Sequence, residues 1–535
     1  MSHRPAAVEL ELFTHRFEAI ASEMGEMLRR TARSTNVKER LDFSCGLLDA
    51  EGRLVANAPH IPVHLGALGL CVRKVRQALP LAPGDVVVTN HPAFGGSHLP
   101  DVTVITPVHS AAGRLLGHVA SRAHHAEIGG IRPGSMPPGA SRLVEEGVVI
   151  PPFRLVEAGE ARWPAMRQLL SAPPYPSRNV DENLADLAAA VAANQRGVRA
   201  LAGLAERCGD ERVAEMMGRL AGAAGERVRQ ALSKLGDLSR SEAEELDDGA
   251  VLQVALGVRA GRLKLDFTGS SGVHPGNLNA PEAVVRSAVL YLLRLLLAQP
   301  LPLNEGLLEP VELVLPPGLL NPPFQADPAL CPAVVGGNVE TSQRLVNLLL
   351  KVFRLSAASQ GTMNNVLFGN QRLAYYETVA GGCGAGPGFA GASAVHSHMT
   401  NTRITDPEVL EQRYPVRLER FAVRRGSGGA GRWPGGDGVV RELLFLASLS
   451  LSILSQNRRR GPFGLEGGDA GAPGRQRLLR ADGSVEELGA IAAREVGPGD
   501  RLILETPGGG GWGSALEDAE APLAEHLVKG HGDAG

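Results

Sequence analysis

Four residues that can bind a metal ion or move a proton lie within one short part of the chain. His98 and Asp101 stand at one end of the stretch 95–130, and His124 and His125 stand near its other end. Two neutral imidazoles and one carboxylate on one side of an ion leave coordination positions open, which is the usual arrangement of a catalytic metal site. These residue types therefore indicate metal-assisted chemistry.

The residues between them predict a β-hairpin that brings the two ends together. Apolar runs flank a break at Ser110–Gly113, which is typical of a hairpin turn. In the register whose paired numbers sum to about 222, His98 lies directly opposite His124. Directly opposed Cβ atoms are roughly 4.5–5.5 Å apart, close enough for two imidazoles to bind one ion. Because Pro100 ends regular pairing, Asp101 can turn toward both.

A simpler alternative is that these side chains are ordinary hydrogen-bonded polar residues at the open end of a hairpin. For any single histidine that alternative is the better one, but four ligands that converge at one strand end favour a metal site. His60 and His64 follow the segment 41–56, itself a predicted hairpin. Since Pro62 separates them, we expect loop and cap roles for both. Glu145 and Glu146, in a Gly- and Pro-rich loop, are expected to be solvated.

Composition narrows the class of protein. The 535 residues exceed the usual size of one core, and 44% hydrophobic content is ordinary for a globular protein. A net charge of −3 gives no electrostatic reason to expect nucleic acid or an anionic membrane as partner. Five dispersed cysteines form no CxxC pair, and the apolar run 287–298 is interrupted by Arg294. We expect a soluble cytoplasmic protein without a membrane span.

The pattern of elements predicts the α+β class, as a large mixed multilayer unit with a helical hairpin insertion and a smaller β-rich C-terminal region. Apolar stripes at helical spacing predict a helix over 8–33 and an antiparallel pair of helices on either side of Gly209. We divide the unit 5–515 into an N-terminal α/β part (5–180) with the His/Asp site, a helical hairpin (181–240), a central α/β part (241–410) and a β-rich part (411–515), followed by a tail (516–535).

A second group of polar residues lies between 336 and 403. Asn338 is a candidate N-cap of an amphipathic helix, and His396 and His398 alternate as neighbours on one strand face do. They could complete a site or form an exposed polar face, and the sequence leaves both open. The formal G-x-G-x-x-G at 386–391 is not followed by a helical pattern, so we reject a dinucleotide site. Its glycines fit close backbone approach to a small ligand, or a flexible loop.

The chain contains no phosphate-binding G-x-x-x-x-G-K-[ST] loop, because none of its six lysines follows a glycine. It also lacks a G-x-S-x-G nucleophile elbow and an H-E-x-x-H zinc motif. If phosphoryl transfer is involved, another chain must supply the nucleotide site.

Several ordered blocks resemble the hydantoinase B/5-oxoprolinase family, over about residues 5–515. They include GGSHLPDVTVITPV, SRAHHAEIGGIRPGSMPPGASRLVEEGVVIPP, VVGGNVETSQR, SQGTMNNVLFGN and GDRLILETPGGGGWG. The resemblance implies a B-type subunit of an ATP-dependent cyclic amidohydrolase, a 5-oxoprolinase or N-methylhydantoinase. A hydantoinase A-type partner would use ATP to phosphorylate the substrate, which implies a hetero-oligomer. One departure is His91, where relatives read Asn-Asp-Pro.

In carboxylase relatives the corresponding subunit holds manganese through residues that match His98, Asp101 and His124. The resemblance therefore implies a divalent metal, Mn²⁺ or Zn²⁺. His125, His396 and His398 are the candidate catalytic residues, with His125 or His396 as general base. Polar residues of two matching blocks, Arg122, Asn338, Glu340 and Gln343, are candidate substrate-binding residues. Two alternatives remain: the large subunit of an acetone- or acetophenone-type carboxylase, and an inactive scaffold subunit.

Overall fold

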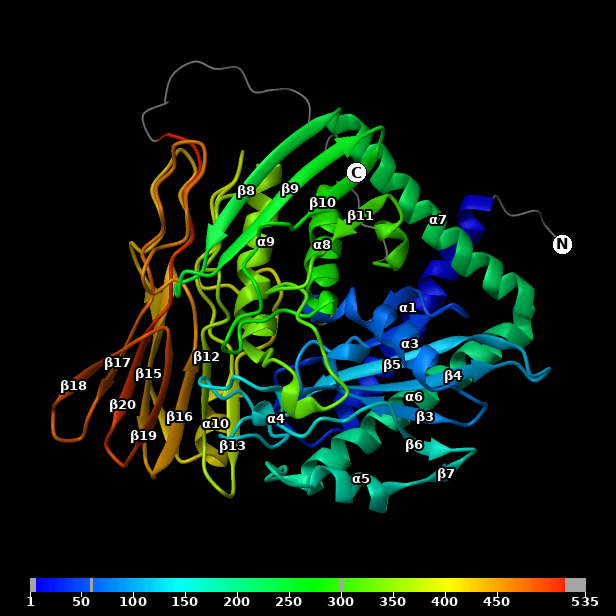
Figure 1. Ribbon diagram of the computed structural model, residues 1–535, viewed down its shortest axis with the longest axis horizontal. Helices are drawn as coiled ribbons and strands as arrows, with labels where there is room; N and C mark the ends of the chain where they lie inside the picture. The colour runs from blue at the N-terminus through cyan, green and yellow to red at the C-terminus, as the bar shows by residue number, and fades with distance from the viewer. Residues whose placement is uncertain (1–5, 58–60, 298–302, 515–535) are drawn as a thin grey trace, which may run out of the picture.

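The computed structural model describes residues 6–57, 61–297 and 303–514, and within them the strands form four sheets. In Figure 1 the seven-stranded N-terminal sheet lies beside long helices, the green strands β8–β11 curve across the top, and the C-terminal strands stand on the opposite side. Helices and separate sheets are mixed through the chain, which confirms the α+β class. His60 lies outside the described residues.

The seven-stranded sheet has the order β2-β1-β5-β4-β3-β6-β7, with every neighbouring pair antiparallel. Its strands are β1 (Phe43–Leu48), β2 (Leu54–Asn57), β3 (Val86–Thr89), β4 (Asp101–His109), β5 (Leu115–His124), β6 (Phe153–Glu157) and β7 (Glu160–Ala161). The β1–β2 pair is the predicted hairpin of residues 41–56.

The other three sheets are smaller. The order β11-β10-β9-β8 comprises β8 (Leu238–Glu245), β9 (Val251–Arg259), β10 (Arg262–Asp266) and β11 (Val311–Val314). The order β13-β12-β16-β19 comprises β12 (Asn365–Gly369), β13 (Ala374–Glu377), β16 (Leu449–Leu454) and β19 (Ile491–Val496). The order β14-β15-β20-β17-β18 comprises β14 (Val416–Arg424), β15 (Gly438–Phe445), β17 (Arg475–Leu479), β18 (Val485–Leu488) and β20 (Arg501–Glu505). The third sheet joins strands from both sides of residue 411, and the predicted boundaries between parts stay predictions.

Helices cover the sheets. They are α1 (Ala6–Thr31), α2 (Thr35–Lys38), α3 (Ala67–Ala78), α4 (Leu143–Glu146), α5 (Trp163–Leu170), α6 (Val180–Cys208), α7 (Asp210–Leu235), α8 (Glu282–Leu296), α9 (Ser342–Phe353) and α10 (Pro407–Arg413). Short turns are η1 (Pro62–His64), η2 (Pro92–Phe94), η3 (Glu305–Leu308), η4 (Pro328–Leu330) and the π-helical η5 (Gly337–Thr341). In α1, Phe13, Phe17, Met24 and Leu28 recur at helical spacing, and this buried stripe belongs to the core beneath the seven-stranded sheet.

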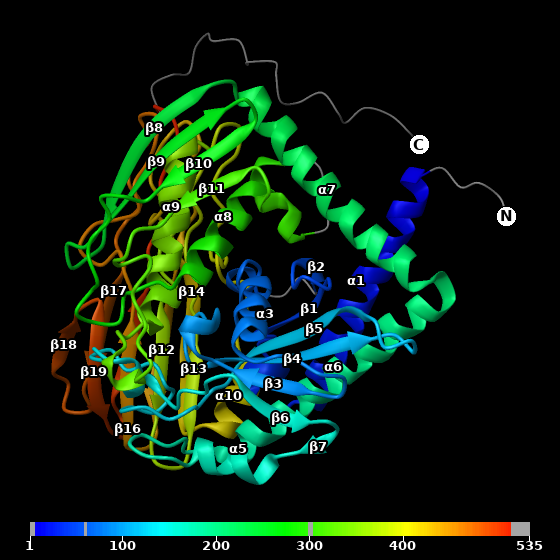
Figure 2. The same ribbon diagram turned by 45° about the vertical axis from the view of Figure 1, so that its right-hand side comes forward.

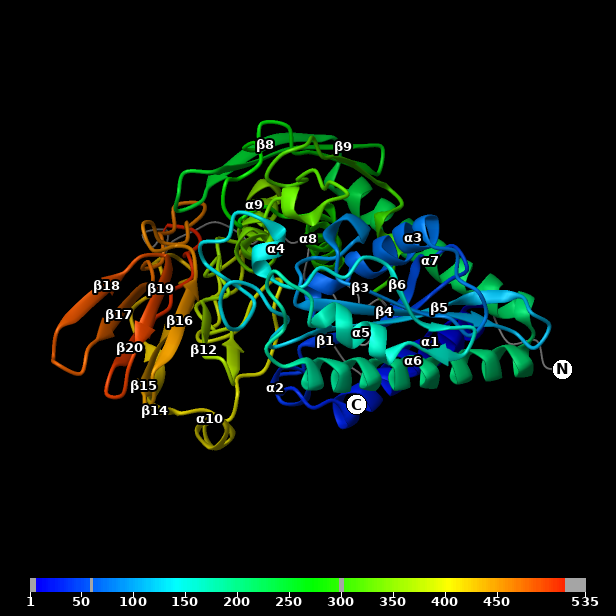
Figure 3. The same cartoon turned by 60° about the horizontal axis from the view of Figure 1, so that its bottom comes forward.

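The helices on either side of Gly209 do not form the antiparallel pair that the sequence predicts. Helix α6 packs against α1 and strands β4 and β5, whereas α7 contacts η3 and β10. Figure 2 shows the two helices diverging from their shared corner, and Figure 3 shows α6 along the N-terminal sheet. The first half of the α7 stripe, from Val213 to Leu220, therefore shares the core of α6 and the seven-stranded sheet, whereas Ala224, Val228 and Leu232 join the core of the β8–β11 sheet. Helical periodicity does not encode this division.

Glu146 corrects another expectation, because its side chain is buried rather than solvated. Its carboxylate accepts hydrogen bonds from the backbone N–H groups of Val334 and Val335 at 2.8–3.1 Å. These bonds tie the Gly- and Pro-rich loop after β5 to the segment that leads into η5. The carboxylate therefore links two segments almost 190 positions apart.

The glycine-rich segments of the C-terminal half pack against one another. A Cβ atom at Gly391 or Gly509 would lie about 2.0 Å or 1.9 Å from the carbonyl oxygen of Cys383, and one at Gly435 would lie 2.0 Å from the carbonyl oxygen of Gly509. In the formal G-x-G-x-x-G, Gly391 thus approaches other backbone, whereas a Cβ at Gly386 would meet the Phe389 ring and one at Gly388 would meet nothing within 4 Å. The two predicted roles, approach to a small ligand and loop flexibility, stay predictions.

This packing predicts a large difference between two glycine substitutions. Gly509→Ala is expected to lower the free energy of unfolding by about 1–3 kcal/mol, because the methyl group meets backbone that must move. Gly497→Ala is the matched control, since nothing lies within 4 Å of its added Cβ. Urea unfolding of both variants measures the effect, and equal stability would contradict the packing described.

Candidate active site

The β4–β5 hairpin brings the predicted ligands together in a register different from the predicted one. Asp101 pairs with His124 and Val102 with Ala123, so paired numbers sum to 225, and the pairing shifts by one residue between Val108 and His109. The prediction that His98 lies directly opposite His124 is therefore wrong. The one-residue irregularity next to the turn moves the register, and β4 begins only at Asp101.

His98 nevertheless reaches the same place from the turn that precedes β4. The His98 and His124 rings have centroids 5.0 Å apart. His98 Nδ1 lies 3.2 Å from Asp101 Oδ2, and His124 Nδ1 lies 3.6 Å from Asp101 Oδ1. One ligand atom from each of the three buried side chains lies within 4.8 Å of the others. A single cation can contact all three.

The two oxygens of Asp101 have different surroundings. Oδ2 accepts a hydrogen bond from Ser97 Oγ at 2.6 Å and contacts His64 Nε2 at 3.0 Å and His98 Nδ1 at 3.2 Å. Among the described residues, neither Asp101 Oδ1 nor His124 Nε2, both of them buried, has a hydrogen-bond partner. Unpaired buried polar atoms are costly, so two of them facing one cavity fit a site completed by an ion.

The electrostatics favour an anionic Asp101 carboxylate and a neutral His124 ring. Burial raises the pKa of Asp101, but His98, His64 and the hydrogen bonds to the carboxylate outweigh it and hold the pKa well below the ordinary value. Burial lowers the pKa of His124. Neutral imidazole and ionised carboxylate are the forms that bind divalent metals, so Mn²⁺ and Zn²⁺ both fit this donor set.

His64 is a site residue that the sequence reading placed in a cap. Its Nε2 donates to Asp101 Oδ2, and its Nδ1 lies 3.0 Å from Ser44 Oγ on β1. The pairing of β1 with β5 sets this contact, and no local sequence signal predicts that pairing.

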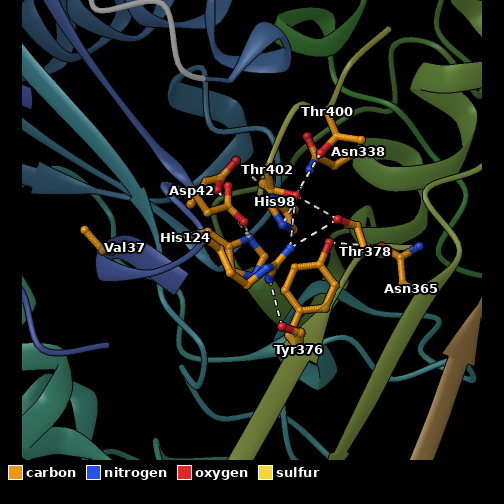
Figure 4. A network of polar contacts seen from close by, with 12 residues as sticks. Val37, Asp42, His98, His124, Asn338, Asn365, Tyr376, Thr378, Thr400 and Thr402 are labelled. Atoms are coloured by element: carbon orange, nitrogen blue, oxygen red, sulfur yellow. Dashed lines mark hydrogen bonds and ion pairs between the residues drawn. The ribbon is translucent and has the colours of Figure 1, made fainter. Parts of the chain in front are cut away.

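A cavity of about 20 Å³ adjoins these ligands. That volume holds a water-sized species but no organic substrate, so substrate binding must widen it. Its lining residues are Asp42, Ile61, Val63, His64, Asp101, His124, Asn338, Val339, Met363, Tyr376, Thr378, Met399 and Thr400. The N-terminal sheet supplies one wall, and segments beyond residue 337 supply the other. Figure 4 shows His98 and His124 facing Asn338, Tyr376 and the threonines across it.

The Tyr376 ring packs against one face of the His124 ring. The two rings are stacked, with centroids 4.7 Å apart and planes 18° from parallel. The Tyr376 hydroxyl donates to Asn365 Oδ1 at 3.0 Å, and Asn365 Nδ2 donates to Glu340 Oε1 at 2.6 Å. This chain of contacts connects the candidate ligand to the π-helical turn.

The three predicted substrate-binding residues of the 338–343 segment lie on η5 and the start of α9. Asn338 lines the cavity, with Nδ2 3.5 Å from His98 Nε2 and Oδ1 without a partner. Glu340 lies behind the cavity wall, and Gln343 Nε2 donates to the Ser397 carbonyl oxygen. A π-helical turn is a rare feature that is frequent at functional sites. It replaces the N-cap expected at Asn338.

Four other candidate residues do not reach the cavity. His125 Nδ1 contacts Asn183 Nδ2 on α6, because successive residues at a strand end face opposite sides. Arg122 donates to Thr103 Oγ1 and to the Gly95 carbonyl oxygen, and so supports the turn before His98.

The third and fourth are His396 and His398, which do not share a strand face. His398 has a positive φ of 58°, contacts Asn347 on α9, and its burial lowers its pKa to about 3. Burial and the nearby Arg40 charge lower the pKa of His396 to about 4. Neither ring is among the residues that line the cavity.

His91 has a structural role that explains its departure from the usual sequence. Its Nδ1 accepts a hydrogen bond from the Ala93 N–H at 3.1 Å and caps η2. Burial lowers the pKa of His91 to about 4, so the ring is neutral and can accept. An imidazole here makes the same kind of cap that an aspartate makes.

Comparison with known proteins agrees with this fold and shows the family. A family model described as hydantoinase B/oxoprolinase matches residues 6–515. The chain belongs to this family. It is 47% identical over 536 residues to 5-oxoprolinase 1 of Arabidopsis thaliana, covering 95% of this chain and 42% of that protein. The chain thus spans about two fifths of the length of this relative.

Two solved structures share the fold. An ATP-dependent caprolactamase from Pseudomonas jessenii has a TM-score of 0.86 and 26% identity, covering 96% of this chain and 92% of that one. A nucleotide-free acetone carboxylase has a TM-score of 0.83 and 17% identity, covering 95% and 76%. At that identity the second likeness shows the fold alone. No helix in the described part of the chain combines the length and apolar character needed to cross a bilayer.

Metal binding by His124 is directly testable. His124→Gln is expected to weaken Mn²⁺ or Zn²⁺ binding about tenfold or more, because the variant lacks an imidazole ligand. His118→Gln is the matched control: His118 is a buried histidine of the same strand that contacts the Asp49 carbonyl oxygen instead. Elemental analysis after dialysis against each metal measures occupancy. Equal metal content in the native chain and the His124 variant would contradict the site.

Glu340 predicts a specific pH dependence of stability. Burial raises its pKa from 4.5 to about 8. Between these values the folded chain holds a proton that the unfolded chain has released, so stability is lost as pH rises toward 8. Glu340→Gln removes this titration. Between pH 6 and 8.5 the free energy of unfolding of the variant should therefore fall by at least about 1.4 kcal/mol less than that of the native chain.

Urea unfolding at the two pH values measures this difference. The exposed Glu226, substituted by Gln, provides the control and should behave as the native chain does. A Glu340 variant with the same pH dependence as the native chain would show that this carboxyl does not hold the proton.

Proposed function

We propose that this chain is the B-type component of an ATP-dependent cyclic amide hydrolase that acts on 5-oxoproline or a hydantoin. The observation that carries the proposal is the buried His98–Asp101–His124 group, with its unpaired Asp101 Oδ1 and His124 Nε2. Two similar proteins support the substrate class, since the 5-oxoprolinase and the caprolactamase are both named for cyclic amides. A partner of the hydantoinase A type would supply the ATP site.

The proposed reaction divides into activation and hydrolysis. The ATP-binding component transfers a phosphoryl group to the amide oxygen and releases ADP. One water then adds to the activated carbon as the ring C–N bond breaks, and a second water hydrolyses the resulting acyl phosphate. For 5-oxoproline the products are glutamate, ADP and phosphate. A bound divalent ion would supply Lewis-acid polarisation and lower the pKa of water.

The residues of this chain have separate roles in that scheme. His98, Asp101 and His124 would hold the ion, and His64 orients the Asp101 carboxylate. His125 and His396 are not among the residues that line the cavity, so Asp42 replaces them as the candidate general base. Its buried carboxylate lines the cavity, with Oδ2 3.9 Å from His124 Nδ1.

Reconstituted turnover tests the function. The chain, an A-type partner, ATP and 5-oxoproline should yield ADP and glutamate, and Asp42→Asn should lower kcat by about 10²-fold or more. Asp49→Asn is the matched control, because Asp49 is the buried carboxylate at the other end of β1. Absence of ADP formation with any cyclic amide would contradict the hydrolase. ATP turnover that requires bicarbonate would indicate a carboxylase instead.

A further inference from the structure

Arg40 is a buried cation without an anionic partner behind one wall of the cavity. Its side chain is inaccessible to solvent, and among the described residues no carboxylate oxygen lies within 4.0 Å of its nitrogens. Nη1 donates to the Tyr376 carbonyl oxygen at 2.8 Å, and Nη2 donates to Thr378 Oγ1 and Thr402 Oγ1 at 3.2 and 3.3 Å. Within the described part of the chain, Nε has no hydrogen-bond partner.

A buried cation without an anionic partner destabilises the folded chain unless a bound ligand supplies the opposite charge. Buried charges in proteins are normally paired, because removing an ion from water is costly and neutral acceptors compensate for only part of that cost. Arg40 also lies over the Tyr376 ring at 4.8 Å, and this contact fixes its position. The guanidinium therefore places a fixed positive charge beside Tyr376, whose ring stacks on the candidate metal ligand His124.

The threonine hydroxyls extend the hydrogen-bond network of Arg40 to the cavity. A guanidinium has donors only, so Thr378 and Thr402 must offer it their hydroxyl oxygens as acceptors. Thr378 Oγ1 and Thr402 Oγ1 are 2.8 Å apart, and Thr400 Oγ1 lies 3.4 Å from Thr402 Oγ1. The hydroxyl protons then point away from Arg40, and Thr378 and Thr400 line the cavity. Because the two hydroxyl–hydroxyl contacts use two of the three protons, one hydroxyl proton remains, and it can be donated into the cavity from Thr378 or Thr400.

We propose that Arg40 and the threonines at 378, 400 and 402 form an oxyanion-binding wall. On the proposed function, its ligand is the carboxylate of the cyclic amide or the phosphoryl group of the activated intermediate. Both groups carry anionic oxygens, in a planar arrangement for the carboxylate and a tetrahedral one for the phosphoryl group. Hydrogen-bond donors and a fixed cation stabilise either of them. Because the empty cavity holds only a water-sized species, ligand binding widens it.

Asp42 and Asp101 are the negative charges that face this wall. A divalent ion and Arg40 together supply three positive charges against these two negative ones, so the loaded site retains one net positive charge. An anionic ligand neutralises that charge. The same ligand without its anionic group gains nothing from Arg40.

Calorimetric titration of the full chain loaded with Mn²⁺ tests the wall without ATP or a partner, so its outcome is independent of turnover. The probes are inorganic phosphate, 5-oxoproline and 2-pyrrolidinone, which is the same lactam without the carboxylate. Arg40→Met and Thr402→Val should weaken binding of phosphate, of 5-oxoproline or of both by roughly tenfold or more, and should leave 2-pyrrolidinone unchanged. Loss confined to phosphate assigns the wall to the phosphoryl group, and loss confined to 5-oxoproline assigns it to the carboxylate.

Thr405→Val is the matched control, because it removes a buried hydroxyl of the same segment that contacts the Tyr375 hydroxyl and not Arg40. It should bind the anions as the native chain does. Near-UV circular dichroism identifies variants that fail to fold, and Thr402→Val keeps the test valid if Arg40→Met does fail. The proposal is overturned if the folded Thr402 variant binds both anions as tightly as the native chain does. It is equally overturned if the Thr405 variant loses as much, or if the native chain binds neither anion.

Discussion

The unequal environment of the two Asp101 oxygens is the constraint on which the site depends. One oxygen is surrounded by a serine hydroxyl and two imidazole nitrogens, whereas the other is buried without a hydrogen bond. The contacts to Oδ2 fix the carboxylate and keep it ionised, so that Oδ1 faces the cavity. A carboxylate held in this way cannot rotate to satisfy both oxygens at once. The fold thus holds Oδ1 in a position where an ion, rather than a hydrogen-bond donor of the described chain, can contact it.

The two walls of the site come from distant parts of the chain. The N-terminal sheet contributes the acidic and imidazole groups, and the π-helical turn, β13 and the 399–402 segment contribute amides, hydroxyls and aromatic rings. Stacking of Tyr376 on His124 and the contact of Arg40 with Tyr376 connect the walls. This division places metal-binding groups on one side and anion-stabilising groups on the other. A reacting carbonyl between them would be polarised at its oxygen and approached by water at its carbon.

The local elements and three site residues were predictable from the sequence. The hairpin between residues 101 and 124, the stripe on α1 and the long helices follow from periodicity and turn residues, and the ligand types follow from the histidines and Asp101. The register was not predictable, because a one-residue irregularity beside the turn changes every pairing. The places of His64, Asp42 and Arg40 in the site were not predictable for a different reason. Their positions depend on the pairing of β1 with β5 and on contacts across more than 300 positions, as in the bond from Arg40 to Tyr376.

A crystal structure of the chain loaded with Mn²⁺, with anomalous diffraction recorded at the manganese edge, tests the central claim most directly. The account predicts one anomalous peak in contact with His98, Asp101 and His124, with Asp101 Oδ1 among the ligating atoms. A peak elsewhere, or none at this place after loading with either Mn²⁺ or Zn²⁺, would contradict it.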